Sequence, residues 1–204
     1  MAYPYKGTKE ENNKRKEHDF YSTPTETTIA LVNYLGKVLN PQLDVIMEPA
    51  CGEGKISEVF RTRGFKISSS DKFTYKYPYG HWGEDFLETE STSTSWIITS
   101  PPFTLAEEFI RKSMELSKKN DHSVGVALLL KSNYWHAKSR HQLFYDFLPT
   151  AIIPLTWRPK FNETQKAPIL DMTWNIWMPI DLYKTLNHDA FAAYTPILKP
   201  EYTQ

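Results

Sequence analysis

The feature that most constrains the fold is a regular alternation of short apolar runs and helix-like segments across residues 24–130. Apolar runs of strand length occupy residues 43–49, 65–71, 96–100 and 124–130. Segments with apolar residues at helical spacing precede or separate them, at residues 24–39, 55–63 and 105–119. Strands joined through helices run parallel because the chain must cross back before it forms the next strand. The sequence therefore predicts an α/β fold with a mostly parallel central sheet.

The pattern changes after residue 130. A helix candidate at residues 139–148 precedes two strand-like runs, 150–157 and 171–178, which are separated by a polar loop. Two strands joined by an irregular loop favour an antiparallel pair at one edge of the sheet. At the start of the fold, Thr23 is expected to cap the first helix, with Pro24 at its first helical position.

Charge and composition exclude several classes of protein. The 204 residues carry 24 basic and 24 acidic side chains, so the net charge indicates neither a nucleic-acid nor a membrane partner. No apolar run reaches the roughly 20 residues that span a bilayer, and the lone Cys51 cannot form an internal disulfide. The histidines lack metal-ligand spacing, so no metal site is expected. We expect a protein of a reducing, cytoplasmic compartment, with a mobile arm at 1–18, one core domain at 19–180 and an extension at 181–204.

A glycine-containing loop follows the first strand-like run. Gly52 and Gly54 lie between this run and a helix-like segment, an arrangement that lets the backbone approach a ligand at the carboxyl end of a strand. A tight turn without a ligand explains the two glycines alone equally well. The positions of three acids favour a ligand, because Glu48, Asp71 and Asp85 each fall at the end of a predicted strand, the last being residues 83–87. Such acids can accept hydrogen bonds from a ribose or an adenine.

Several motifs together resemble one family. "EPACGEG", the upstream "DFYSTP" and the downstream "SPPF" occur in the order found in class I S-adenosylmethionine-dependent methyltransferases that modify exocyclic amines of DNA bases. "KSNYWHAKSRHQLF", "WRPKF" and "DMTWNIW" resemble the second half of the phage-type adenine-N6 (Dam-like) enzymes, which also belong to restriction-modification systems. The resemblance covers residues 19–178. It implies a Rossmann-like class I methyltransferase fold, S-adenosylmethionine as the cofactor, and residues 19–180 as the catalytic domain.

The resemblance also implies roles for individual residues. Asp71 would bind the ribose hydroxyls, Asp85 and Phe86 the adenine, and Glu48 the methionine amino group. The full set of cofactor-binding residues is Tyr21, Thr23, Pro24, Glu48, Pro49, Ala50, Gly52, Gly54, Asp71, Asp85 and Phe86. Cys51 is expected to be a small residue packed beneath the loop and not a nucleophile.

The tetrapeptide Ser100, Pro101, Pro102 and Phe103 would be catalytic. The Ser100 hydroxyl and the Pro101 carbonyl would accept the two hydrogens of an exocyclic amine, the prolines would hold these acceptors in place, and Phe103 would stack on the flipped base. Taken alone, the tetrapeptide is more typical of a turn that ends a strand, and its position after the cofactor-type motifs favours the catalytic role.

The target base remains open at this stage. The second half of the sequence favours adenine N6, whereas serine at the first position of the tetrapeptide is typical of cytosine-N4 enzymes. The alternatives are a cytosine-N4 methyltransferase, an RNA or protein-glutamine methyltransferase, and an inactive cofactor- or DNA-binding accessory protein. DNA is the expected partner and RNA a possible one, in a phage-infected or bacterial cytoplasm; the recognition sequence and oligomeric state are open. Candidate phosphate contacts are Lys138, Arg140, Arg158, Lys160 and Lys166.

Overall fold

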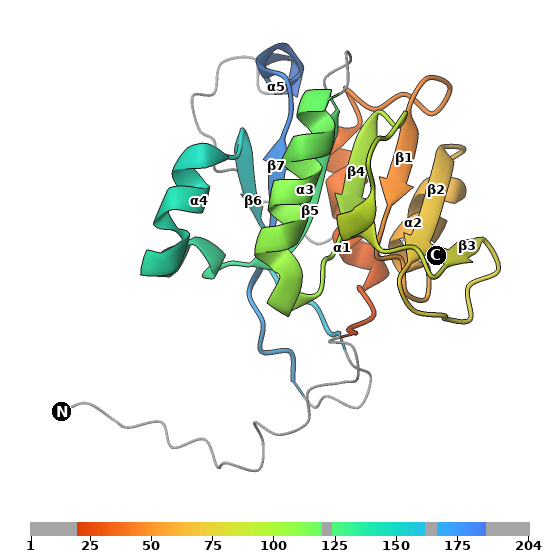
Figure 1. The fold of residues 1–204 in the computed structure, drawn as a ribbon, viewed down its shortest axis with the longest axis horizontal. Helices are drawn as coiled ribbons and strands as arrows, with labels where there is room; N and C mark the ends of the chain where they lie inside the picture. Colours follow the sequence, from red (N-terminus) through yellow and green to blue (C-terminus); the bar gives the residue numbers. More distant parts are fainter. Residues whose placement is uncertain (1–19, 120–123, 162–166, 187–204) are drawn as a thin grey trace.

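The computed structural model describes residues 20–119, 124–161 and 167–186. They form one seven-stranded sheet with helices on both faces (Figure 1). The strands are β1 (Val45–Glu48), β2 (Lys66–Asp71), β3 (Gly80–Trp82), β4 (Trp96–Thr99), β5 (Gly125–Lys131), β6 (Ala151–Pro154) and β7 (Met172–Trp177). The α-helices are α1 (Thr25–Leu35), α2 (Lys55–Arg61), α3 (Ala106–Lys119), α4 (His141–Asp146) and α5 (Ile180–Leu186).

The strand order across the sheet is β3-β2-β1-β4-β5-β7-β6. The first five strands in this order are parallel, and β7 runs antiparallel to both of its neighbours, β5 and β6. The predicted α/β class, the mostly parallel sheet and the antiparallel pair at one edge are therefore confirmed. Because all strands except β7 point the same way, the loops after β1, β2, β4 and β5 emerge at one edge of the sheet.

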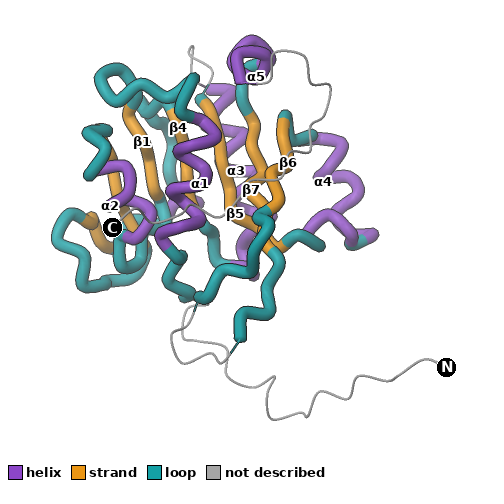
Figure 2. The backbone as a smooth tube through the Cα atoms, turned by 180° about the vertical axis from the view of Figure 1, so that it is seen from behind, coloured by secondary structure: helices purple, strands orange, loops and turns teal. Residues whose placement is uncertain are grey.

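Helices cover both faces of the sheet. Figures 1 and 2 show α3 on one face and α1 with α2 on the other. Side chains of β4 alternate between the two resulting cores: Trp96 and Ile98 pack with α1 and α2, whereas Ile97 packs with α3. A strand buried on both faces has no solvent-facing position, which explains why β4 and β5 read as continuous apolar runs.

The first helix begins later than expected. Pro24, in an extended conformation, is the N-cap of α1, and no side chain caps the helix, so the prediction that Thr23 caps it is wrong. The Thr27 hydroxyl instead donates a hydrogen bond of 2.8 Å to the Pro24 carbonyl. The Trp174 indole of β7 donates to the Thr27 carbonyl at 2.9 Å, which fixes the start of α1 against the sheet.

The strand predicted at residues 83–87 is wrong. A short strand, β3, lies earlier, inside the segment rich in Tyr, Pro and Gly, and ends at Trp82. Gly83 follows with a left-handed φ of 81°, which an extended strand does not accommodate. Asp85 then caps a 3₁₀ turn, Phe86–Glu88, by accepting a hydrogen bond of 3.0 Å from the Leu87 amide.

Both ends of the chain fall partly outside the described residues. This applies to the predicted arm at 1–18 and to most of the predicted extension at 181–204, of which α5 contains the first residues. Among the described helices, none is long and apolar enough to cross a membrane.

We expect Trp174→Phe to weaken the attachment of α1 to the sheet. The change removes the indole hydrogen bond to Thr27 from a fully buried position, so the free energy of unfolding should fall by about 1 kcal/mol or more. Urea unfolding measures this loss of unfolding free energy. Trp82→Phe is the control, because the structure shows no hydrogen bond from that indole to any described residue; an equal loss in both variants would contradict the role of the bond.

Candidate functional site

An open pocket lies where the carboxyl ends of β1, β2 and β4 meet. The empty space inside it, including the part open to solvent, is about 830 Å³. The lining comes from several segments of the sequence: residues 20–23 before α1, the end of β1 with the loop and the start of α2, the end of β2 with the residues that follow, residues 84–86, the tetrapeptide after β4, and Leu105 with Phe109 at α3. Among the residues predicted as cofactor-binding or catalytic, those that line it are Tyr21, Thr23, Glu48, Pro49, Ala50, Asp71, Asp85, Phe86, Ser100, Pro101, Pro102 and Phe103.

The remaining three predicted residues lie outside this lining. Pro24 caps α1, and Gly52 and Gly54 have left-handed φ angles of 49° and 75°. A Cβ at Gly52 would lie 2.3 Å from the Phe20 ring, and one at Gly54 would lie 2.3 Å from the Tyr77 ring. The sequence suggested that the missing side chains leave room for a ligand, but the space next to each glycine is taken by an aromatic ring.

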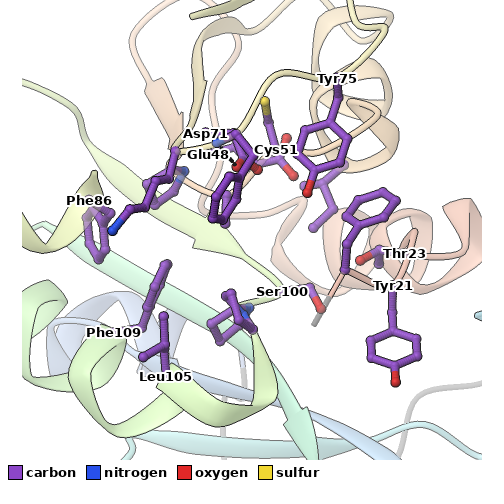
Figure 3. Close-up of a pocket in the computed structure, with 18 of the residues that line it drawn as sticks. Tyr21, Thr23, Glu48, Cys51, Asp71, Tyr75, Phe86, Ser100, Leu105 and Phe109 are labelled. Atoms are coloured by element: carbon purple, nitrogen blue, oxygen red, sulfur yellow. Dashed lines mark hydrogen bonds between the residues drawn. The ribbon is translucent and has the colours of Figure 1, made fainter. Parts of the chain in front are cut away.

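Asp71 connects the glycine loop to the end of β2. Its carboxylate accepts 2.9 Å hydrogen bonds from the Gly52 amide and from the Phe73 amide, and only 8% of the residue is exposed. Asp71 also lines the pocket, which places its carboxylate within reach of a ligand bound there. The loop that lines the pocket is therefore held by an acid that faces the same pocket (Figure 3).

Glu48 is an acid buried at the base of the pocket. It is 1% exposed, and its carboxylate accepts a hydrogen bond from the hydroxyl of Ser57, which lies 2.6 Å from the hydroxyl of Ser69. Burial raises the pKa of Glu48 well above its ordinary value, and the Ser57 hydrogen bond opposes this only in part. A cationic group placed beside Glu48 would favour its charged form.

Both carboxylate oxygens of Asp85 have partners within the chain. One oxygen accepts from the Leu87 amide, and the other lies 2.7 Å from the Lys72 ammonium. The hydrogen bond from Lys72 lowers the pKa of Asp85. An adenine amino group that binds Asp85 must therefore share it with Lys72 or displace that exposed side chain. Phe86 is buried and packs on Phe109 at 4.9 Å between ring centroids.

The tetrapeptide lies between the acids and the residues before α1. Figure 3 shows Ser100 between the group formed by Glu48 and Asp71 and the side chains of Tyr21 and Thr23. Among the described residues, none hydrogen-bonds to the Ser100 hydroxyl. Phe103 stacks on Tyr21, with ring centroids 5.5 Å apart and an angle of 29° between the rings. The site thus presents one polar acceptor next to a stacked aromatic pair.

Cys51 is buried, and burial raises the pKa of its thiol, which disfavours the thiolate needed for nucleophilic attack. Within the described ranges, no group of three or more His, Cys, Asp or Glu side chains is placed to hold a metal ion.

The predicted phosphate contacts that the structure describes do not line the pocket. Arg140 donates to the Tyr134 carbonyl at 2.6 Å and covers the Tyr134 ring, and Arg158 pairs with Asp171 at 2.8 Å. Lys138 and Lys160 are exposed, and Lys166 lies outside the described residues.

Several pocket residues were not singled out from the sequence, among them Phe20, Lys72, Phe73 and Tyr75. Phe20 and Tyr75, far apart in sequence, bring their ring centroids to 4.5 Å. The available signal was compositional, since aromatic residues are dense in "DFYSTP" and in the segment at 73–82, but no spacing rule pairs the two segments.

The fold is shared with solved methyltransferases. A Pyrococcus horikoshii protein assigned as an RNA methyltransferase matches with a TM-score of 0.56 at 14% identity, over 85% of this chain and 90% of that one. A Vibrio vulnificus protein assigned as the modification subunit of a type I restriction enzyme matches with a TM-score of 0.53 at 13% identity. The match covers 77% of this chain and 44% of that one. The Pyrococcus abyssi tRNA (uracil-54, C5)-methyltransferase, solved with S-adenosyl-L-homocysteine, matches with a TM-score of 0.53 at 13% identity. The match covers 78% of this chain and 40% of that one.

The chain therefore spans less than half of the last two proteins. No protein-family model matches the sequence, and a search of curated proteins finds no match. At these identities the comparisons establish the fold, which is that of class I methyltransferases.

We expect Glu48→Gln to change how stability depends on pH. Because folding raises the pKa of Glu48 from its ordinary value of 4.5, this group stabilises the folded state fully below that pH, and its contribution falls as the pH rises through the raised pKa. Glutamine does not titrate. The variant should therefore gain stability over the parent as the pH rises above 4.5, by up to about 1.4 kcal/mol per pKa unit of the shift.

Chemical unfolding at several pH values measures this difference. Glu53→Gln, at an exposed position of the same loop, is the matched control and should parallel the parent. A Glu48→Gln curve that also parallels the parent would show that burial does not perturb Glu48.

Proposed function

We propose that this protein is a methyltransferase that uses S-adenosylmethionine to methylate an exocyclic amine of a nucleic-acid base. The observation that carries the proposal is the convergence of Ser100–Phe103 with Glu48 and Asp71 on one pocket of a methyltransferase fold. A chance strand-ending turn gives no reason for a serine acceptor and an aromatic pair to face the same pocket as these acids.

The charge of the pocket fits this cofactor. Its lining contains five acidic side chains, Glu48, Glu53, Asp71, Glu84 and Asp85, against the two basic side chains of Lys55 and Lys72. An excess of negative charge favours a cationic ligand and disfavours the phosphates of a dinucleotide. S-adenosylmethionine carries a sulfonium and an ammonium group, and when bound it supplies an electrophilic methyl group.

Each part of the cofactor has a candidate partner. Glu48 would bind the ammonium, Asp71 the ribose hydroxyls, and Asp85 with Phe86 the adenine. Lys72 would leave Asp85 when the adenine binds, which its exposed position allows at little cost. Pro49, Ala50, Gly52 and Gly54 would shape the loop around the methionine part, and Tyr21, Thr23 and Pro24 would close it from the side of α1.

The chain's own residues would prepare the amine. The lone pair of an exocyclic amine is delocalised into the ring, so it needs hydrogen-bond acceptors that turn it toward the methyl donor. The Ser100 hydroxyl and the Pro101 carbonyl are the candidate acceptors, and Pro101 and Pro102 hold them without further ordering. Phe103 would stack on the base after it leaves its helix.

The base that we propose as the target is adenine in DNA, methylated at N6. The resemblance of residues 131–177 to phage-type adenine enzymes favours it, and Ser100 favours cytosine N4 as the second candidate. Solved proteins of the same fold include enzymes of both RNA and DNA modification, so RNA belongs in the first assay. That assay incubates the protein with methyl-labelled cofactor and either DNA or RNA, followed by mass spectrometry of the nucleosides. Unlabelled nucleosides with a protein that binds the cofactor would indicate an accessory role instead.

We expect Asp71→Asn to weaken binding of S-adenosylmethionine. The change removes the charge from the proposed ribose contact, which is worth about 1.5 to 3 kcal/mol, or about 10- to 150-fold in affinity. Isothermal titration calorimetry measures it, with Asp44→Asn, an acid at the opposite end of β1, as the control. Equal affinity in parent and Asp71→Asn would remove Asp71 from the site.

We expect Ser100→Ala to lower the methylation rate by about 10²- to 10³-fold while cofactor affinity stays near that of the parent, because a lost preorganised acceptor acts on the reacting amine. Phe103→Ala should weaken productive base binding by about 1 to 3 kcal/mol. Ser100→Asn keeps an acceptor and should stay closer to the parent. Parental rates in Ser100→Ala and Phe103→Ala would reduce the tetrapeptide to a turn, whereas loss of cofactor binding in both would make it a structural support.

A further inference from the structure

Lys131 lies directly against the aromatic ring of the tetrapeptide. Its ammonium is 4.3 Å from the centroid of the Phe103 ring. Lys131 ends β5 and is half-buried, and among the described acids none forms an ion pair with it. It was not among the residues selected from the sequence as phosphate contacts.

β5 extends further than β4, so its last residue, Lys131, lies beyond the end of β4. Thr99, the last residue of β4, pairs with Leu128, so β5 continues beyond the level at which the tetrapeptide leaves the sheet. Lys131 itself pairs with Met172 at the start of β7, and the Ser132 amide donates to the Asp171 carbonyl at 2.8 Å. Lys131 therefore lies at the edge of the sheet where β4 and β5 end, next to the loop between β6 and β7.

That loop brings further positive charge to the same place. Arg158 pairs with Asp171, and the exposed Lys160 precedes Phe161, whose ring lies edge-on to Phe103 at 6.4 Å. We call Lys131, Arg158 and Lys160 the basic rim. Phe103 thus separates an acidic pocket from a basic rim. Because the acids of the pocket repel phosphates, the basic rim offers favourable charge to the backbone of a nucleic-acid strand that delivers its base to the pocket.

The contacts of the Phe103 ring show which residue must move. The ring is stacked by Tyr21 and covered by the Lys131 ammonium, so a base that stacks on Phe103 must displace one of them. The Lys131 ammonium is on a flexible four-carbon stem and can move at low cost. Tyr21 is part of the segment that leads into α1 and lines the pocket. Arrival of a base therefore releases Lys131 and not Tyr21.

We propose that Lys131 is a substrate-positioning residue that covers the Phe103 ring in the free protein and binds a phosphodiester next to the target nucleotide when the base displaces it. The inference rests on the proposed function and adds to it the path of the strand. Arg158 has an acid partner within the chain, which leaves Lys131 as the member of the rim nearest the ring and without a described acid to neutralise it.

The test compares Lys131→Gln with Lys131→Arg and with Lys37→Gln, an exposed lysine beyond the opposite end of α1. Binding of a fluorescent DNA oligonucleotide and of the matching RNA is measured by anisotropy over a range of salt concentrations, and cofactor affinity by calorimetry. Lys131→Gln should lower the slope of log affinity against log salt by about one unit, because one phosphate contact is lost. Lys131→Arg and Lys37→Gln should keep the parental slope, and cofactor affinity should be unchanged in all three.

A second measurement locates the contact. A series of oligonucleotides carries one neutral methylphosphonate linkage, at a different position of the strand in each. At one position next to the methylated base, the neutral linkage should lower the affinity of the parent but not that of Lys131→Gln. An unchanged salt slope in Lys131→Gln, or equal sensitivity of both proteins at every linkage, would overturn the inference. A parent that binds the cofactor but methylates neither DNA nor RNA would instead overturn the proposed function.

Discussion

The hydrogen bonds accepted by Asp71 hold the site together. One buried carboxylate joins the amide of Gly52, in the loop after β1, to the amide of Phe73, just after β2. The neighbouring parallel strands bring these loops to one edge of the sheet, and Asp71 fixes their relative position. Phe20 can then pack on Gly52, and the segment before α1 closes the pocket beside the tetrapeptide. The other contacts of the site depend on this arrangement.

Much of the fold could be predicted because its strands obey simple rules. A run such as 124–130 has no polar position, which only a strand covered on both faces accommodates, and β5 indeed lies between two cores. Glu48 and Asp71 also followed from one rule, that parallel strands end at the same edge of a sheet, whereas most other predicted pocket residues came from the resemblance to methyltransferases. The sequence could place Glu48, Asp71 and Ser100 together on this basis, without any knowledge of side-chain packing.

The remaining features depend on contacts between segments that no local pattern connects. The strand expected at 83–87 failed because Gly83 ends the extended conformation and Asp85 caps a turn, a choice made by two residues within an otherwise strand-like stretch. The glycines were expected to leave room for a ligand, but aromatic rings from residues 20 and 77 reach them through tertiary packing. The ion pair of Lys72 with Asp85 joins positions on either side of β3, and hydrophobic periodicity contains no information about it.

The buried Glu48 has a consequence for any cationic ligand of this pocket. Burial shifts the equilibrium of Glu48 toward the neutral acid, whereas a neighbouring ammonium group shifts it toward the carboxylate. Binding of the cation is then coupled to the release of a proton from Glu48 into solution. The heat of binding consequently includes the ionisation enthalpy of the buffer, so two buffers at the same pH give different heats for the same ligand. This difference counts the protons released, and it reports on Glu48 without any substitution.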